Sequence, residues 1–217
     1  MNYRFVACDR CKVNQADSLP ISKSSREFGF GLDMFCENQI GLGVQYASML
    51  QGLRAQGCQD VVVLMHSDAE LTQEDWRKRL DDAFLKYDIV GVAGSKCFRF
   101  QHPATWFNAE RVWWSGGISH PDMPVDYFGP PTRVAVLDGV FMAINLARVT
   151  ALTFRVDFGF HHYDLAFCVD AVISGIKVGT ADLLVKHHSR GNFGSPEFIA
   201  SSRHFLDVYG RNKVLSV

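Results

Sequence analysis

The sequence lacks a long apolar run: none approaches the length of about 18 residues that a helix needs to cross a bilayer. Its first residues also lack the basic, apolar and small-residue pattern of a signal peptide. It has no basic excess, since 22 Lys and Arg face 23 Asp and Glu. Without such an excess a chain neutralises few nucleic-acid phosphates. We therefore expect a cytoplasmic protein, free or held peripherally at the inner membrane face, whose main partner is not nucleic acid.

The sequence also lacks the paired cysteine motifs of a structural zinc site. Cys8 and Cys11 form a C-x-x-C pair, but neither a second such pair nor a matching histidine pair follows at the usual spacing. The six cysteines are otherwise spread along the chain. We expect reduced thiols, with a zinc or redox role for Cys8 and Cys11 as the alternative.

No repeat, low-complexity tract or linker interrupts the 217 residues, which suit one domain, 1–217. Strand-like and helix-like patterns alternate along the chain. This order predicts an α/β fold with a mostly parallel central sheet flanked by helices. We expect strands at 3–8, 61–65, 88–95, 133–145 (interrupted at Asp138-Gly139) and 177–185. We expect helices within 37–52, from 72, at 164–174 and from 196 to about 210.

Residues 97–133 are rich in aromatic side chains and broken by Gly and Pro. We interpret this stretch as a long irregular excursion or as short hairpins, because loops of this length in a compact domain are usually functional. Trp113 and Trp114, with Trp106 nearby, could form a platform on which a sugar stacks. The alternative is that these rings pack beneath the loop.

Four polar clusters follow expected strands or begin expected helices. They are His66-x-Asp68-x-Glu70, Asp138-Gly139, 161–164 and 187–189. In open α/β sheets, ligands bind beyond the carboxyl ends of the strands. Carboxylates there suit Mg²⁺ or Mn²⁺ together with a phosphorylated ligand. The alternative for each cluster is that polar residues simply end a buried strand.

The order and spacing of several motifs resemble a known enzyme group. They are Glu37-Asn38 and Gly41-Leu42, HSDAEL at 66–71, VAGS at 92–95, VLDGVFMA at 136–143, FGFHHYDLAF at 158–167 and H-x-S-x-G at 187–191. Together they resemble the bacterial family-2-like glycosyltransferases of the A-type fold whose aspartate motif reads His-x-Asp. The resemblance implies a single Rossmann-like domain, with a nucleotide-binding half at about 1–95 and an acceptor-side half at about 96–217.

The resemblance also implies how the donor is bound. Asp68 matches the aspartate that contacts Mn²⁺ or Mg²⁺, and His187 matches a histidine that completes the metal or diphosphate site, with His188 as the alternative if the register is shifted by one. His66 stands where the usual pair has its first Asp, so it faces either the ribose or the ion. Asp9 and Gly139 are further donor-binding candidates, although Asp9 is equally suited to a turn.

The catalytic and acceptor-side assignments come from the same resemblance. Asp164 matches the base of inverting members, and its alternative role is that of a helix N-cap. Asp138 is the second candidate for the base or for binding a sugar hydroxyl. His162 joins Trp113 and Trp114 as an acceptor-binding candidate.

We therefore expect an inverting, metal-dependent glycosyltransferase that uses a nucleotide diphosphate sugar, with a UDP-sugar favoured. Its acceptor would be a hydroxyl of a glycan, a lipid-linked carrier or a protein. A nucleotidyltransferase is an alternative, but the loop at 8–12 lacks the glycines that such enzymes use to hold a triphosphate. A second alternative is a sugar- or protein-binding domain that has kept this fold and lost catalysis, because His66 replaces the first aspartate of the usual metal-binding pair.

Overall fold

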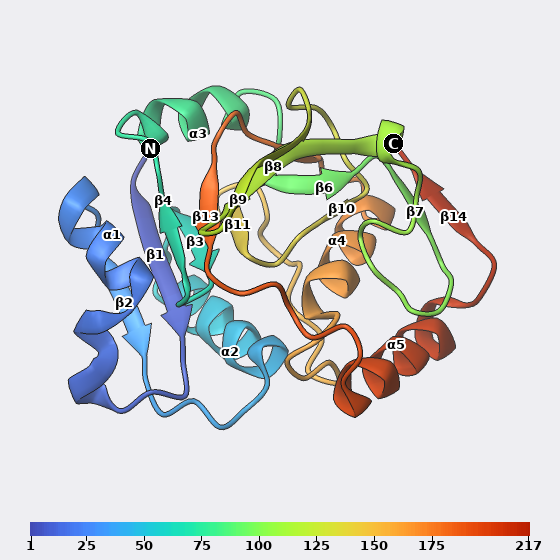
Figure 1. Ribbon diagram of the computed structural model, residues 1–217, viewed down its shortest axis with the longest axis horizontal. Helices are drawn as coiled ribbons and strands as arrows, with labels where there is room; N and C mark the ends of the chain where they lie inside the picture. The colour runs from blue at the N-terminus through green and yellow to red at the C-terminus, as the bar shows by residue number, and fades with distance from the viewer.

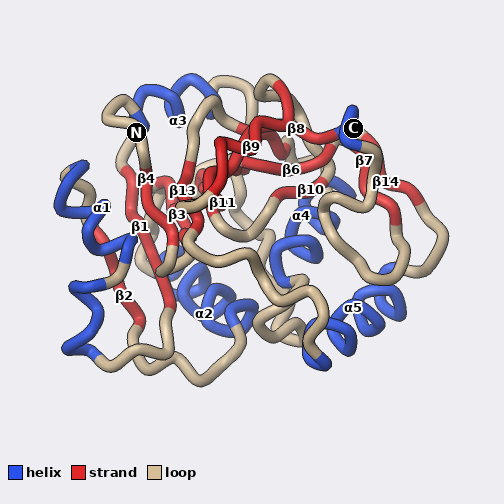
Figure 2. Tube along the Cα trace, viewed as in Figure 1, coloured by secondary structure: helices blue, strands red, loops and turns tan.

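The computed structural model describes the backbone of residues 1–217 and every side chain except those of Met123 and Pro124. The chain folds into a mixed α/β structure with three sheets. The strands gather in the middle of the molecule and the helices lie around them (Figure 2). The α/β class expected from the sequence is thus confirmed.

The sheet that carries the first strand has the order β12-β5-β11-β3-β1-β2. β11 pairs antiparallel with both β3 and β5, whereas the other three pairings are parallel. Most strands of this sheet therefore share one direction, as expected. The bounds are β1 (Tyr3–Cys8), β2 (Leu32–Phe35), β3 (Val61–Met65), β5 (Ile89–Gly91), β11 (Phe141–Asn145) and β12 (Val178–Thr180).

A second sheet has the order β10-β6-β8-β13-β4, and β9 pairs with β8 at its side. Its pairings are antiparallel except that of β13 with β8. The expectation of a single, mostly parallel Rossmann-like sheet is therefore too simple. The bounds are β4 (Ala69–Leu71), β6 (Ala93–Ser95), β8 (Trp114–His120), β9 (Met123–Gly129), β10 (Val136–Leu137) and β13 (Val185–His187).

Three segments expected as strands are each divided between the two sheets. Residues 88–95 form β5 and β6, residues 133–145 form β10 and β11, and the segment expected at 177–185 gives β12 and the start of β13. The break within 133–145 falls at Asp138-Gly139, where the sequence predicted an interruption. Within 88–95 the residues on both sides of the break are buried, so hydrophobicity alone does not reveal where the chain changes sheet. The 97–133 stretch contains the β8–β9 hairpin, so the hairpin alternative is confirmed there. The first strand of the 97–133 stretch, β7 (Cys97–Arg99), lies outside this hairpin and pairs with β14 (Val214–Ser216).

The helices follow the sequence expectations in part. α5 begins after Ser195, whose Oγ accepts a hydrogen bond from the Phe198 amide, as its N-cap pattern indicated. The helix expected from residue 72 begins later, with Asp75 at the N-cap position. α1 was not expected, because serines share its buried face with Ile21 and weaken the apolar pattern. The bounds are α1 (Pro20–Phe28), α2 (Leu42–Ala55), α3 (Trp76–Phe84), α4 (Tyr163–Ile173), α5 (Pro196–Tyr209) and the 3₁₀ helices η1 (Val13–Ser18) and η2 (Arg111–Trp113).

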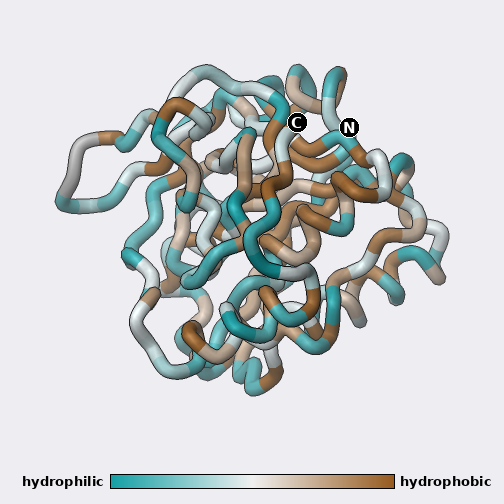
Figure 3. Tube along the Cα trace, turned by 90° about the vertical axis from the view of Figure 1, so that its right-hand side faces the viewer, coloured by the Kyte–Doolittle hydropathy of each residue, from teal (hydrophilic) through white to brown (hydrophobic). Residues whose placement is uncertain are grey.

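The buried apolar side chains of both sheets and their helices form one connected cluster. Hydrophobic segments accordingly concentrate in the interior, and hydrophilic ones follow many of the outer loops (Figure 3). β1, β2 and α1 lie at one side of the molecule and α4 and α5 at the other (Figure 1). Among the described residues, none of the helices has the length and apolarity that a membrane crossing requires.

Candidate functional site

The site is built where a late strand returns beside an early turn. β3 ends at Met65, and the chain turns so that the Ala69 amide donates to the His66 carbonyl at 3.1 Å. β13 then pairs antiparallel with β4, and this register sets His187 opposite Ala69. Residues more than a hundred positions apart are thereby brought together.

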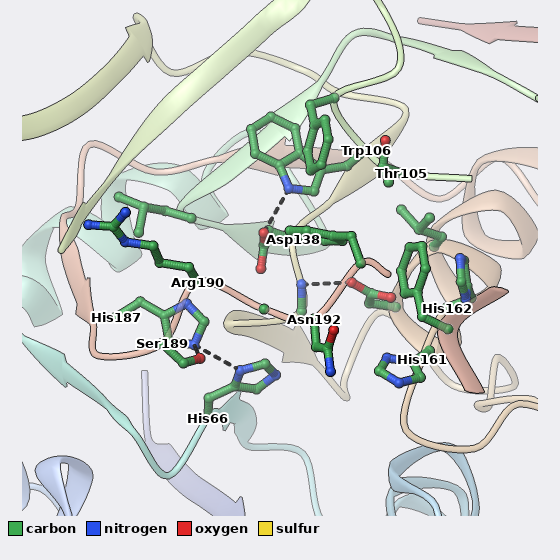
Figure 4. A pocket seen from close by; sticks show the side chains of 18 of the residues that line it. His66, Thr105, Trp106, Asp138, His161, His162, His187, Ser189, Arg190 and Asn192 are labelled. Atoms are coloured by element: carbon green, nitrogen blue, oxygen red, sulfur yellow. Dashed lines mark hydrogen bonds between the residues drawn. The ribbon is translucent and has the colours of Figure 1, made fainter. Parts of the chain in front are cut away.

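Three side chains converge at this junction. The Nε2 atom of His187 lies 3.3 Å from Oδ1 of Asp68 and 3.4 Å from Nδ1 of His66. The Nδ1 atom of His66 lies 4.0 Å from the same Asp68 oxygen. Figure 4 shows the two imidazole rings facing each other. These ligand atoms all lie within 4.8 Å of one another, so the three residues fit a single divalent cation.

The charges of this group are coupled. Burial acts to raise the pKa of Asp68, but hydrogen bonding and the charge of His187 bring the pKa well below its usual range. Burial acts to lower the pKa of His187, yet Asp68 raises it overall. Burial and the nearby His187 lower the pKa of His66. At neutral pH the group therefore presents an ionised carboxylate and a neutral His66, which are the forms that bind metals.

The neighbouring polar residues are engaged elsewhere. Nε2 of His188 lies 3.0 Å from Oε1 of Glu70, and Nζ of Lys186 lies 3.1 Å from the same oxygen. Glu70 therefore does not join His66 and Asp68, although the sequence run suggested it. Of the two histidines considered, the structure brings His187 to Asp68.

A cavity of about 450 Å³ opens beside the three-residue group. His66 and His187 line it, whereas Asp68 is held at its margin through His187. Much of the remaining wall is aromatic. Other residues around it include Trp106, Phe107, Trp114, Phe128, Asp138, Gly139, Phe160, His162, Tyr163, Asp164, Arg190 and Phe198.

Asp138 lies between the two sheets, directly after β10. Its Oδ2 accepts a hydrogen bond from the Trp106 indole at 2.7 Å, and its Oδ1 accepts one from the Val140 amide at 2.8 Å. The first of these contacts is drawn in Figure 4. Both carboxylate oxygens are thus held by protein donors, which fixes the orientation of the side chain.

Asp164 occupies the second position of α4 and faces the same cavity. His162, with a left-handed φ of 63°, takes the N-cap position, so the alternative role of Asp164 as the N-cap is wrong. The Gly139 amide donates to Oδ2 of Asp164 at 2.8 Å. Burial, followed by the charge of Asp138, raises the pKa of Asp164 to about 7. A carboxyl group with that pKa can exchange a proton near neutral pH.

Gly139 makes room for neighbouring protein atoms. A Cβ at this position would lie 2.7 Å from the Tyr163 hydroxyl oxygen and 2.9 Å from Oδ2 of Asp164. Gly139 itself lines the cavity, so the absence of a side chain also leaves its backbone at the cavity wall.

Two of the sequence-derived candidates, Asp9 and Trp113, do not line the cavity, and a third, His162, is buried in its wall. Asp9 accepts hydrogen bonds from the Cys11 amide and the Ser67 hydroxyl and does not line the cavity. Trp113 is exposed, with the Lys96 ammonium over its ring. His162 borders the cavity but is buried, and its ring nitrogens lie 2.9 Å from Oγ of Ser201 and from the Ala104 carbonyl. Its contacts are those of a structural residue.

Cys8 and Cys11 do not pair with each other in the described structure. The Sγ atom of Cys11 lies 3.8 Å from that of Cys36, and all six cysteines are free. The expectation of reduced thiols agrees with this arrangement.

Two contributors to the site were not identified from the sequence. Trp106 was grouped with stacking residues, but its indole N–H orients Asp138. Tyr163 contacts His66 and Gly139, although it was treated only as part of the FGFHHYDLAF motif. Its position directly before Asp164 was the available signal.

Comparison with known proteins supports the fold alone. No protein-family model matches the chain, and no curated protein matches it as a relative. Among solved structures, the chain is similar to the crystal structure of A197 from STIV, with a TM-score of 0.55 and 14% identity. The match covers 87% of this chain and 86% of that one. It therefore concerns the α/β architecture over most of both chains.

Proposed function

We propose that this protein is an inverting, metal-dependent glycosyltransferase that moves a sugar from a nucleotide diphosphate sugar to an acceptor hydroxyl. One observation carries the proposal: a cation-binding group and a carboxyl group with a pKa of about 7 border one cavity. A UDP-sugar is the favoured donor because of the motif resemblance described above. A cytoplasmic location, free or at the inner membrane face, belongs to the same proposal.

The donor diphosphate would lie beside His66, Asp68 and His187. Sugar transfer builds negative charge on the departing diphosphate, and a bound Mn²⁺ or Mg²⁺ supplies the stabilising positive charge. The three side chains would hold and orient this cation. Arg190, in the exposed loop after β13, is a basic residue at the cavity wall on this side.

The base is assigned to Asp164 rather than to Asp138. An inverting transfer requires a group that removes the proton of the attacking acceptor hydroxyl. Asp138 already accepts two hydrogen bonds that fix its carboxylate. Asp164 has the near-neutral pKa that suits proton transfer, and the charge of Asp138 helps to raise that pKa.

The acceptor would lie against the aromatic wall of the cavity. Trp114 belongs to that wall, together with Trp106 and Phe128, whose rings pack edge to face with it. Aromatic faces bind the apolar faces of sugars and other amphipathic groups. The acceptor class remains a glycan, a lipid-linked carrier or a protein.

The test is a panel of nucleotide sugars with and without Mn²⁺, followed by release of the nucleotide diphosphate and transfer of the sugar. We expect metal-dependent turnover with at least one donor. Asp164→Asn should lower this turnover by about 10²–10⁴-fold. Asp207→Asn, which changes an exposed acid on α5 paired with Arg211, should leave it unchanged. Pyrophosphate release from a nucleoside triphosphate and a sugar phosphate would favour a nucleotidyltransferase instead. Binding without turnover across the panel would favour the non-catalytic domain.

A further inference from the structure

Tyr163 connects the His66 side chain to the backbone of Gly139. Its hydroxyl oxygen lies 3.2 Å from Nε2 of His66 and 3.4 Å from the Gly139 carbonyl oxygen. The tyrosine side chain is buried, and its ring packs against Tyr46 and Phe154. The hydroxyl is therefore held in one place by its surroundings.

These contacts determine which nitrogen of His66 carries the proton. A carbonyl oxygen can only accept a hydrogen bond, so the single Tyr163 proton goes to Gly139. The tyrosine oxygen is then free to accept a hydrogen bond from Nε2–H of His66. In a neutral imidazole this leaves the Nδ1 lone pair free, and Nδ1 is the atom that faces His187 and Asp68.

We propose that His66 is a third metal ligand through Nδ1 and that the resulting site discriminates against Mg²⁺. Tyr163 is the positioning residue that keeps the His66 proton on Nε2. This inference rests on the metal site of the proposed function. Two imidazoles and one carboxylate form a nitrogen-rich set, which suits later transition-metal ions such as Co²⁺. Mg²⁺ prefers oxygen ligands, as an aspartate at position 66 would supply.

Gly139 helps to maintain this arrangement. Its amide is bonded to Asp164 and its carbonyl to Tyr163, so the same residue supports the proposed base and the proposed positioning residue. A side chain at 139 would meet the Tyr163 hydroxyl directly. The metal site and the base are therefore coupled through one backbone position.

The test is calorimetric titration of the metal-free full chain with Co²⁺, Mn²⁺ and Mg²⁺, together with the visible absorption spectrum of bound Co²⁺. Tyr163→Phe removes the hydroxyl that orients His66, and loss of such an outer partner typically weakens metal binding by about 10–100-fold. Tyr46→Phe is the matched control, because Tyr46 is equally buried and packs on Tyr163 without a contact to His66. We expect the control to bind Co²⁺ as the unaltered chain does.

His66→Ala and His66→Asp test the ligand itself, at a position that is only partly buried. We expect His66→Ala to weaken Co²⁺ binding and change the Co²⁺ spectrum, and His66→Asp to raise the affinity for Mg²⁺ relative to Co²⁺. Unchanged Co²⁺ affinity and spectrum in His66→Ala would overturn the inference. If Asp68→Ala still abolished binding in that case, the metal site of the proposed function would stand without His66. If the unaltered chain bound none of the three ions, both would fail.

Discussion

Asp164 carries the proton transfer of the proposed reaction, and its carboxylate is held by the Gly139 amide in the first turn of α4. Asp164→Asn preserves the shape and removes the base. We expect turnover to fall by about 10²–10⁴-fold, the usual cost of losing a general base. Donor affinity measured by calorimetry should change little. Turnover that survives the substitution would transfer the role to Asp138.

The pKa of about 7 at Asp164 predicts a pH dependence. A base must be deprotonated, so kcat/KM should rise as the pH increases through about 7. Burial and the charge of Asp138 cause the raised pKa, so Asp138→Asn should move the midpoint of the profile to lower pH. A pH–rate series on both proteins checks this, and an unmoved midpoint would contradict the coupling.

The same shift has a consequence for stability. The folded pKa of Asp164 lies above the usual value of 3.8, so the native state binds more protons than the unfolded state between these values. The contribution of Asp164 to the free energy of unfolding is therefore greatest at low pH and declines as the pH rises towards about 7.

Asp68 provides the carboxylate of the cation-binding group. Loss of an outer-shell partner typically weakens metal binding by about 10–100-fold. Asp68→Ala removes a direct ligand, so it should weaken the Mn²⁺-dependent binding of UDP by more than this. Glu70→Ala is a suitable control, since Glu70 lies two residues away but pairs with His188 and Lys186. Calorimetry with and without Mn²⁺ measures both, and equal affinities would contradict the assignment.

At the scale of elements, local signals determined some boundaries well. Ser195 and Pro196 predicted the start of α5, and Gly175, with a φ of 79°, follows α4 as a helix-ending residue should. η1 and α1 escaped prediction because residues 12–26 are mostly polar, and β2 because it is a run of only four residues with Asp33 within it. The sheet change within 88–95 also escaped prediction, because a buried strand has the same hydrophobic pattern in either sheet.

The cap of α5 can be tested directly. The Ser195 hydroxyl accepts the Phe198 amide at 3.1 Å, and removing such a cap typically costs about 1 kcal/mol. Ser195→Ala should lower the free energy of unfolding by roughly this amount in a urea titration, with an unchanged m-value. Equal midpoints for the two proteins would show that another group satisfies the helix end.

At the scale of the whole molecule, the sequence predicted that Asp68, Asp164 and His187 would converge on one cleft. The structure brings Asp164 and His187 to one cavity and places Asp68 beside His187. That prediction followed from polar residues near the ends of buried strands and from the motif resemblance. The contacts that orient them could not be predicted in the same way. Trp106 reaches Asp138 from the 97–133 excursion, and the bond between Tyr163 and His66 depends on how α4 packs against both sheets.

The proposed metal site would also connect the two halves of the chain, because His66 and Asp68 come from one half and His187 from the other. A cation that binds only this folded arrangement stabilises it by mass action, by about 2.7 kcal/mol at a concentration 100 times its Kd. For a chain of this length that corresponds to a rise in Tm of roughly 5–10 °C. Thermal unfolding with Mn²⁺ and with EDTA checks the shift. Asp68→Ala should lose the rise while Glu70→Ala retains it, and a rise that persists in Asp68→Ala would place the cation elsewhere.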